Sequence, residues 1–166
     1  MDNLTARELS GSEQPDREEE DSPQVKPPLK LREHIIEIIS DSGEGAQKCG
    51  QSFASIAAKM GNGIWTVELI PAEIEPPPRS IAGASGNRIR VGSHRVTNGC
   101  DEADLAVAFN EQVLLGRLRA GALKRGGIIL IENKWRFHRQ ADIVAAYTAI
   151  HEELVRDGYR VYEIPM

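Results

Sequence analysis

Short apolar runs that alternate with helical segments constrain the fold of this chain more than any other feature. Five runs have the length and apolar content of buried strands, at residues 35–39, 64–70, 104–110, 127–132 and 159–164. Segments with helical periodicity, at residues 46–60, 111–119 and 141–156, follow the first, third and fourth runs. This alternation predicts an α/β fold with a doubly wound, mostly parallel sheet and helices on both faces.

The middle of the chain departs from this alternation. Residues 87–91 and 93–97 have the pattern of two short strands around Gly92, which predicts a small antiparallel insertion in the form of a hairpin. Before it, residues 71–86 hold four prolines and many small residues. A loop of this length inside a compact domain is usually functional or covered by a partner.

Residues 1–30 differ in composition from the rest of the chain. They lack hydrophobic periodicity and are rich in acidic residues, Ser and Pro, so we expect a disordered acidic arm followed by one α/β domain over residues 31–166. Residues 1–22 contain eight acidic residues and two arginines, whereas the whole chain has a net charge of −5. The expected domain is therefore close to neutral.

Basic residues form three clusters in this neutral part. Such clusters suit a solvated surface, a phosphorylated ligand or an acidic partner. The clusters are Arg79, Arg88, Arg90, His94 and Arg95; Arg117, Arg119, Lys124 and Arg125; and Lys134, Arg136, His138 and Arg139.

Targeting signals and cysteine usage indicate a compartment. The sequence has no run of about 18 apolar residues and no basic region followed by an apolar core at its start, so we expect neither a membrane span nor a secretory signal. Its two cysteines, Cys49 and Cys100, have no cysteine partner nearby and no metal-ligand spacing. A disulfide framework or an iron–sulfur cluster in this chain is therefore not expected, and we predict a cytoplasmic location.

The stretch Ser40-Asp41-Ser42-Gly43-Glu44-Gly45-Ala46-Gln47 joins the first predicted strand to the first predicted helix. Its two glycines permit positive φ and close approach of a ligand, and the helix start aims N–H groups and a positive dipole end at an anion. A dinucleotide site would need a third glycine at position 48, where this chain has Lys48. The turn therefore suits a phosphate, a carboxylate or a partner backbone rather than NAD.

No arrangement of residues typical of catalysis is evident. The four histidines lie apart from any Cys or Asp at triad or metal-ligand spacing, so we assign no catalytic residue and no metal ligand. Cys49 falls in the first turns of the predicted helix. It is either a small residue packed on the sheet or a thiol whose pKa the helix start lowers.

Three short motifs follow one another along the chain. Gly43-Glu44-Gly45-Ala46-Gln47 follows the first strand, a loop opened by Pro71 contains Arg79-Ser80, and Asp101-Glu102-Ala103-Asp104 leads into a strand that ends Phe109-Asn110. On these motifs, residues 35 to about 135 resemble the gamma domain of the 2-oxoacid:ferredoxin oxidoreductases. Ala46 and Lys48 depart from the glycines of that family's turn. The sequence of the turn is similar to that of the 2-oxoglutarate branch, whose alpha subunit begins with a gamma domain.

The resemblance implies a subunit of an oxidoreductase without a complete active site of its own. Complexes of this family decarboxylate a 2-oxoacid on thiamine pyrophosphate, pass electrons through [4Fe-4S] clusters to ferredoxin and release an acyl-CoA. Thiamine pyrophosphate, Mg and the clusters are then expected on partner alpha and beta subunits or domains. It also implies an oligomer with 2-oxoglutarate as substrate, and neither nucleic acid nor membrane as a partner.

Coenzyme A is the ligand that the resemblance implies for this chain. The residues expected to bind it are Ser42, Gly43, Gly45, Gln47, Arg79 and Ser80. The first four line the turn, and the last two contact phosphate or pantetheine, or else the neighbouring subunit. The alternative is a free-standing module that binds coenzyme A or a nucleotide and does not catalyse a reaction.

Overall fold

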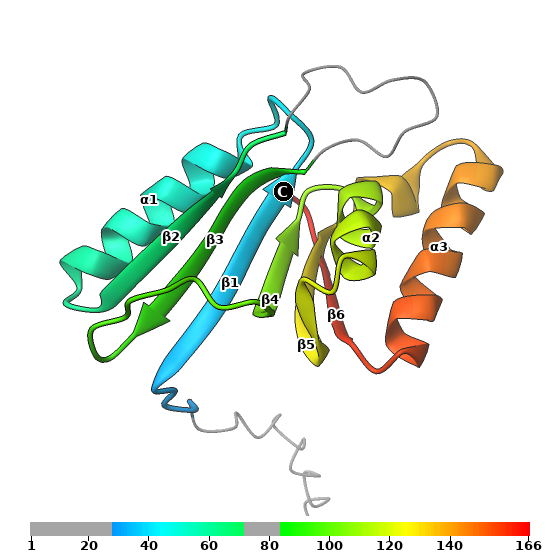
Figure 1. Cartoon of the computed structure of the whole chain (residues 1–166). Coiled ribbons are helices and arrows are strands. Elements are labelled where there is room, and N and C mark those ends of the chain that lie inside the picture. Colours follow the sequence, from blue (N-terminus) through cyan, green and yellow to red (C-terminus); the bar gives the residue numbers. More distant parts are fainter. Residues whose placement is uncertain (1–27, 72–83) are drawn as a thin grey trace, which may run out of the picture. The chain divides into compact units, whose positions relative to one another are not determined.

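The computed structural model describes residues 28–71 and 84–166 of the chain. Within them a single sheet has the strand order β2-β3-β1-β4-β5-β6 (Figure 1). The strands are β1 Glu33–Ser40, β2 Gly63–Leu69, β3 Ser85–Gly92, β4 Ala103–Ala108, β5 Leu123–Glu132 and β6 Arg160–Ile164. The helices are α1 Ala46–Lys59, α2 Glu111–Arg119 and α3 Ala141–Arg156, with a short 3₁₀ helix η1 at Lys134–Phe137. Residues 1–27, most of the expected disordered arm, lie outside the described residues.

The predicted α/β fold with a mostly parallel sheet is confirmed. Strand β4 pairs in parallel with β1 and with β5, and β5 pairs in parallel with β6. Strand β3 is antiparallel to both of its neighbours, β1 and β2. None of the helices in the described residues is long and apolar enough to cross a membrane.

The hairpin expected around Gly92 does not form, so that prediction was wrong. Strand β3 is paired along its whole length, from Glu33 opposite Gly92 to Ser40 opposite Ser85 on the β1 side, and its other edge is taken by β2. No edge is left for residues 93–97, which carry no regular structure and run back across Gly63. The antiparallel element is therefore a full strand inside the sheet.

Alternation along β1 distributes apolar side chains to two cores, one on each face of the sheet. Ile35 and Ile39 belong to the core under α2 and α3, together with Leu114 and Tyr147. Ile36 and Ile38 belong to the other core, under α1. Both faces of this central strand are buried, which is why its sequence is an almost continuous apolar run.

One charged residue interrupts that run and is buried in the middle of the sheet. Glu37 is 2% exposed and forms ion pairs with Arg88 of β3 at 2.7 Å and Arg117 of α2 at 2.5 Å. Arg90, two residues further along β3, pairs with Glu33 at 2.7 Å. These arginines of the predicted basic clusters therefore bind the chain's own carboxylates and do not form a patch for a phosphorylated ligand.

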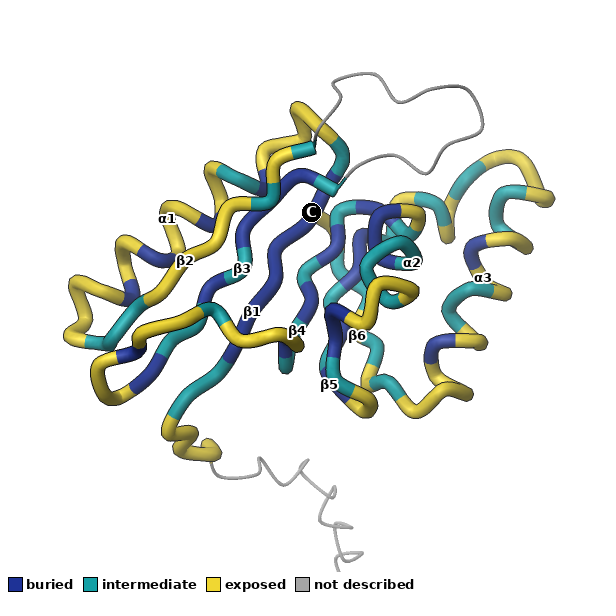
Figure 2. Tube along the Cα trace, viewed as in Figure 1, coloured by how far each residue is buried: buried dark blue, intermediate teal, exposed yellow. Residues whose placement is uncertain are grey.

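Helix α1 forms where predicted but turns its small residues to the sheet. Its buried positions are Ala46, Gly50, Ala54 and Ala57, a row spaced by three or four residues. A Cβ on Gly50 would lie 2.6 Å from Asn87 Cβ, so the helix sits very close to β3. The bulkier residues of the periodic pattern, Phe53, Ile56 and Met60, are exposed instead, and Figure 2 shows the alternation of buried and exposed residues along α1.

Candidate functional site

The turn after β1 lies at the carboxyl edge of the parallel strands, where α/β folds usually bind ligands. Its first residue, Ser40, is fully buried and donates its hydroxyl to the carbonyl of Asp41 at 2.8 Å. Gly43 and Gly45 adopt φ values of 91° and 97°, and a Cβ on either would meet no atom within 4 Å. The predicted positive φ is confirmed at both positions, and the space beside them is open.

Helix α1 begins at this turn without a side-chain cap. Its N-cap residue is Gly45, and no side chain of the described residues bonds to the first turn. The N–H groups at the start of a helix have no partner within it, and they carry the positive end of the dipole. The turn therefore offers hydrogen-bond donors to an acceptor that approaches from solvent.

Two carboxylates lie beside these donors. Glu44 Oε2 accepts a hydrogen bond from the backbone N–H of Asp41 at 3.0 Å. Asn110, two residues after the end of β4, donates its side-chain N–H to Asp41 Oδ2 at 3.0 Å and to Glu44 Oε2 at 3.3 Å. Asn110 Oδ1 accepts from the N–H of Val113 at 2.9 Å and so caps α2. One amide thus connects the turn after β1 to the turn after β4.

Sequence reasoning treated Asn110 only as part of a motif and missed it as a residue of this edge. An Asn between an apolar strand and a helix was the available signal, because Asn is a favoured N-cap. At this edge Asp41 Oδ1 and Glu111 Oε2 are enclosed and accept no hydrogen bond from the described residues. The edge therefore offers unpaired donors to solvent and encloses two carboxylate oxygens that have no partner among the described residues.

Burial first, and then the Glu44 carboxylate, raises the pKa of Asp41 above its ordinary value of 3.8. At pH values between 3.8 and the raised pKa, the folded chain binds a proton at Asp41 more readily than the unfolded chain does. The contribution of Asp41 to the free energy of unfolding therefore increases as the pH falls through the raised pKa. Replacing Asp41 with asparagine removes the effect. Asp41→Asn is expected to stabilise the chain most at neutral pH, with an advantage over wild type that shrinks as the pH falls, measured by urea unfolding at a series of pH values.

Asp104 provides a control with the opposite sign. Burial alone would raise its pKa, but hydrogen bonds from Lys124 Nζ at 2.6 Å and from the Ile35 N–H at 2.8 Å hold it below 3.8. Asp104→Asn is therefore expected to destabilise the chain at neutral pH, with a loss that shrinks as the pH falls. An Asp41→Asn variant with the same pH trend as Asp104→Asn contradicts the placement of Asp41.

The four turn residues predicted to bind a ligand are placed as follows. Ser42, Gly43 and Gly45 are exposed on the turn. Gln47 is half-buried, and its Nε2 donates to the carbonyl of Leu69 at 3.2 Å, which fixes the start of α1 to the end of β2. Its own carbonyl accepts from Asn87 Nδ2 at 2.7 Å. The side chain of Gln47 therefore supports the turn rather than presenting itself to solvent.

Arg79 and Ser80 lie outside the described residues. The strands on either side of their segment are described: β2 ends at Leu69 and β3 begins at Ser85, which pairs with Ser40 at the end of β1. Both ends of the segment are thus attached at the edge that carries the glycine turn. Their role as ligand contacts stays a prediction.

Cys49 and Cys100 are both exposed unpaired thiols. The expectation that Cys49 packs on the sheet was wrong, because Gly50 and Ala46 occupy the buried row of α1. Among residues 28–71 and 84–166, no three His, Cys, Asp or Glu side chains come together in a way that could hold a metal ion.

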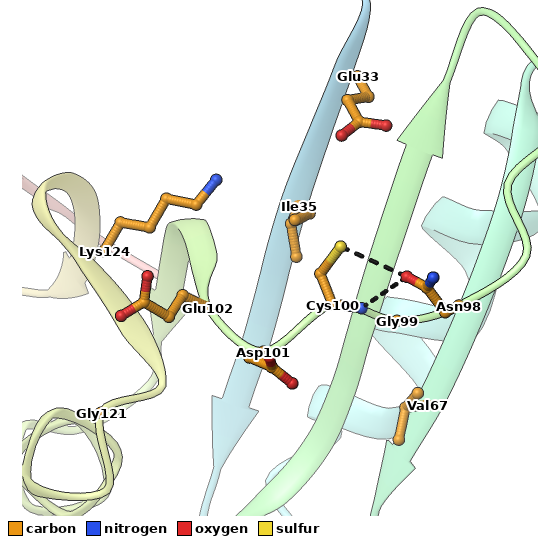
Figure 3. A pocket seen from close by; sticks show the side chains of 10 residues that line it. All are labelled: Glu33, Ile35, Val67, Asn98, Gly99, Cys100, Asp101, Glu102, Gly121 and Lys124. Atoms are coloured by element: carbon orange, nitrogen blue, oxygen red, sulfur yellow. Dashed lines mark hydrogen bonds between the residues drawn. The ribbon is translucent and has the colours of Figure 1, made fainter.

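A hollow of about 960 Å³ lies at the opposite, amino edge of β1 (Figure 3). Its lining includes the carboxylates of Glu33, Asp101 and Glu102, and one cation, Lys124, which is paired with Asp104 at 2.6 Å. Three carboxylates make it a poor receptor for an anion. This hollow is therefore separate from the glycine turn and does not fit a phosphorylated ligand.

Comparison with known proteins matches residues 36–166 to the family model described as pyruvate ferredoxin/flavodoxin oxidoreductase. The chain is 32% identical over 137 residues to the 2-oxoglutarate oxidoreductase subunit KorA of Mycobacterium tuberculosis, a match that covers 82% of this chain and 21% of that protein.

The fold is similar to that of a 2-oxoglutarate:ferredoxin oxidoreductase from Magnetococcus marinus, solved with 2-oxoglutarate, coenzyme A and succinyl-CoA bound. That similarity has a TM-score of 0.60 at 21% identity and covers 82% of this chain and 20% of that chain. This chain thus spans about a fifth of the length of both relatives.

Proposed function

The chain belongs to the pyruvate ferredoxin/flavodoxin oxidoreductase family, and on that premise we propose that it is the gamma-type part of a 2-oxoacid:ferredoxin oxidoreductase complex. The observation that carries the proposal is the family match, which runs from β1 to the last residue. The similarity to a 2-oxoglutarate oxidoreductase subunit favours 2-oxoglutarate as the substrate. The two unpaired cysteines fit a reducing compartment, and we place the complex in the cytoplasm.

The chemistry of decarboxylation and electron transfer is assigned to partners in this proposal. Thiamine pyrophosphate, Mg and [4Fe-4S] clusters are held by alpha and beta subunits or domains, and ferredoxin is reached through the complex. The support is that about four fifths of each relative lies outside the region matched here. This chain contributes structure and a binding surface for coenzyme A.

The described residues of the glycine turn fit the pantetheine arm of coenzyme A better than its phosphates. Secondary amides carry both an N–H and a carbonyl, and this edge presents unpaired donors at the start of α1 beside the exposed acceptor side chain of Glu44. Phosphates at the same place would meet the carboxylates of Asp41 and Glu44. We therefore assign pantetheine to the turn formed by Ser42, Gly43 and Gly45, with Gln47 holding that turn in place, and phosphate to Arg79 and Ser80.

Arg79→Ala tests the phosphate contact. In the assembled complex the variant is expected to raise the apparent KM for coenzyme A about tenfold or more, because one charge-assisted hydrogen bond contributes about 1.5–3 kcal/mol. The KM for the 2-oxoacid should stay unchanged. Steady-state kinetics of 2-oxoacid-dependent viologen reduction measure both constants.

The matched control is Arg119→Ala, at the exposed end of α2 and far along the helix from the carboxyl edge. It should leave the KM for coenzyme A as in wild type. An unchanged KM for Arg79→Ala in an assembled complex contradicts the assignment of Arg79 to the cofactor and leaves a contact with the neighbouring subunit as its role.

The proposal as a whole is tested by native purification through this chain. Thiamine-binding and iron–sulfur proteins should co-purify with it, together with 2-oxoacid-dependent, coenzyme A-stimulated reduction of a viologen dye. Comparison of several 2-oxoacids identifies the substrate. A chain that purifies alone and without activity contradicts the subunit assignment and favours a free-standing binding module, which a titration with coenzyme A then tests.

A further inference from the structure

The bulky apolar side chains of α1 form a continuous stripe that the fold leaves exposed. Cys49, Phe53, Ile56 and Met60 recur at intervals of four, three and four residues, which places them along one side of the helix. The exposed fractions are 38% for Phe53, 60% for Ile56 and 76% for Met60. A stripe of this kind normally faces a core, so its exposure needs a cause.

Hydrogen bonds show which way the stripe faces. On one side of α1, Gln47 Nε2 donates to the Leu69 carbonyl and Gln51 Nε2 donates to Glu68 Oε1, and both acceptors belong to β2. The stripe lies on the other side of the helix, beyond the buried row of small residues. Because the strand order is β2-β3-β1-β4, that side faces β1 and β4.

The sheet beside the stripe is also apolar and has no helix over it among residues 28–71 and 84–166. Leu105 and Val107 of β4, with Phe109 just beyond the strand, pack against the core under α1 and are half-buried. Leu105 and Val107 are paired with Ile128 and Leu130 of β5, which lie on the same face of the sheet. Leu130 is in turn paired with Tyr162 of β6, which is 53% exposed. Helices α2 and α3 pack on the opposite face of these strands.

We infer that the stripe and this part of the sheet, together called the α1–β5 surface, are where the rest of the oxidoreductase complex docks. The inference rests on the proposed function for the identity of the partner. Parallel strands are almost always covered on both faces, whereas the described residues place helices over only one face of the parallel strands β4, β5 and β6. Each relative has about four fifths of its length outside the matched region, which is ample chain to cover this face.

The charge around the α1–β5 surface favours a different partner over a second copy of this chain. Helix α1 carries Lys48 and Lys59 and no acidic residue, and Arg160 of β6 is exposed on the same side of the sheet as Ile128. Glu132 lies on the same face of β5, but it is buried, and its carboxylate accepts hydrogen bonds from the backbone N–H groups of Lys134 and Met166. Two copies would oppose their cations, whereas a partner with an apolar centre and an acidic rim complements them.

The two cysteines provide a test that needs no substitution. In the isolated chain a maleimide should modify both Cys49, which lies on the α1–β5 surface, and Cys100, which lies in the loop before β4 on the other side of the sheet. In the natively purified complex Cys49 should lose most of its reactivity. Mass spectrometry of the labelled peptides measures both rates, with the isolated chain as the reference.

A matched pair of substitutions provides the second measurement. Ile56→Asp places a charge at the centre of the stripe, and Val155→Asp places one on α3 at a position that is 50% exposed. Both side chains are already exposed, so both variants should fold, as thermal unfolding of the isolated chains will show. Ile56→Asp is expected to weaken assembly at least about tenfold, and Val155→Asp to leave it unchanged.

The outcomes separate this inference from the proposed function. Suppose that the wild-type complex assembles and is active. If Cys49 in it reacts as fast as in the isolated chain, or if the Ile56→Asp variant assembles normally, the docking surface alone is overturned. A wild-type chain without thiamine-binding partners overturns the proposed function, and the identity of the occupant with it. A wild-type dimer that Ile56→Asp converts to a monomer assigns the surface to a second copy and overturns the inference.

Discussion

Replacing Glu37 with alanine is expected to lower the free energy of unfolding by about 3–5 kcal/mol, the usual cost of removing one member of a buried ion pair. Glu37 is 2% exposed, and its carboxylate accepts from Arg88 at 2.7 Å and from Arg117 at 2.5 Å. The side chains of Arg88 and Arg117 are 11% and 24% exposed. Without Glu37, two largely desolvated guanidinium groups face each other, so the loss exceeds that of a surface pair.

Urea unfolding followed by circular dichroism measures the effect, and two further variants interpret it. Glu37→Gln keeps the shape of the side chain and removes its charge, so it should fall between wild type and Glu37→Ala. Glu33→Ala removes a carboxylate from the same strand that pairs with Arg90 at 2.7 Å but is 36% exposed, and its effect should be much smaller. Equal losses for Glu37→Ala and Glu33→Ala are incompatible with a buried role for Glu37.

The ion pairs of Glu37 also explain why the sequence did not predict how β3 is placed. Arg88 reaches Glu37 because β3 lies beside β1, and it also donates to the carbonyls of Cys100 and Asp101 in the following loop. This tertiary contact draws the chain after Gly92 across the sheet, so residues 93–97 do not pair back as a hairpin. Local alternation of residue types contains no information about such a contact.

Elements with strong local signals were predictable. The helices at Glu111–Arg119 and Ala141–Arg156 form as predicted, since each has a helical apolar period and a glycine just after its end. Strand β5 begins at Leu123, four residues before the predicted start. The predicted boundary was wrong because Gly126 and Gly127 resemble a turn, whereas Gly126 adopts a φ of 71° within the strand, where the pairing with β4 shifts register.

The candidate site was predictable where it depends on backbone conformation. The positive φ of Gly43 and Gly45 follows from strand–glycine–helix order alone. Asn110 lies 69 residues after Asp41 and 66 after Glu44, and only the pairing of β4 with β1 brings Asn110 and the adjacent Glu111 to the turn. The assignments of Arg79 and Ser80 stay predictions, because these residues lie outside the described part of the chain.

The orientation of α1 was not predictable from hydrophobicity. An apolar period through Phe53, Ile56 and Met60 normally marks the side of a helix that faces the core. Here close packing decides instead, because Gly50 and three alanines let the helix axis approach β3, and Asn87 fills the narrow space between them. Hydrophobic periodicity does not distinguish residues that face the core of a domain from residues that contact a partner outside it.

Gly50→Ala tests this packing and is expected to lower the free energy of unfolding by about 1–3 kcal/mol, the usual cost of overpacking. Alanine is the better helix former by about 1 kcal/mol, so helix propensity alone predicts the opposite sign. The new methyl group would lie 2.6 Å from Asn87 Cβ and 2.7 Å from Asn87 Nδ2, and Asn87 is 1% exposed and cannot move aside. Urea unfolding of the isolated chain measures the difference.

Ser55→Ala is the matched control, because Ser55 is an exposed residue of the same helix and its replacement changes propensity alone. It should be neutral or slightly stabilising. The clash at Gly50 also acts on the bond from Asn87 Nδ2 to the Gln47 carbonyl at 2.7 Å, and through it on the start of α1 beside Gly45. Gly50→Ala should therefore also raise the KM for coenzyme A in the assembled complex. If Gly50→Ala is destabilised but its KM for coenzyme A is unchanged, the packing of α1 does not control the geometry of the turn. If Gly50→Ala is as stable as Ser55→Ala, α1 does not pack this closely on β3.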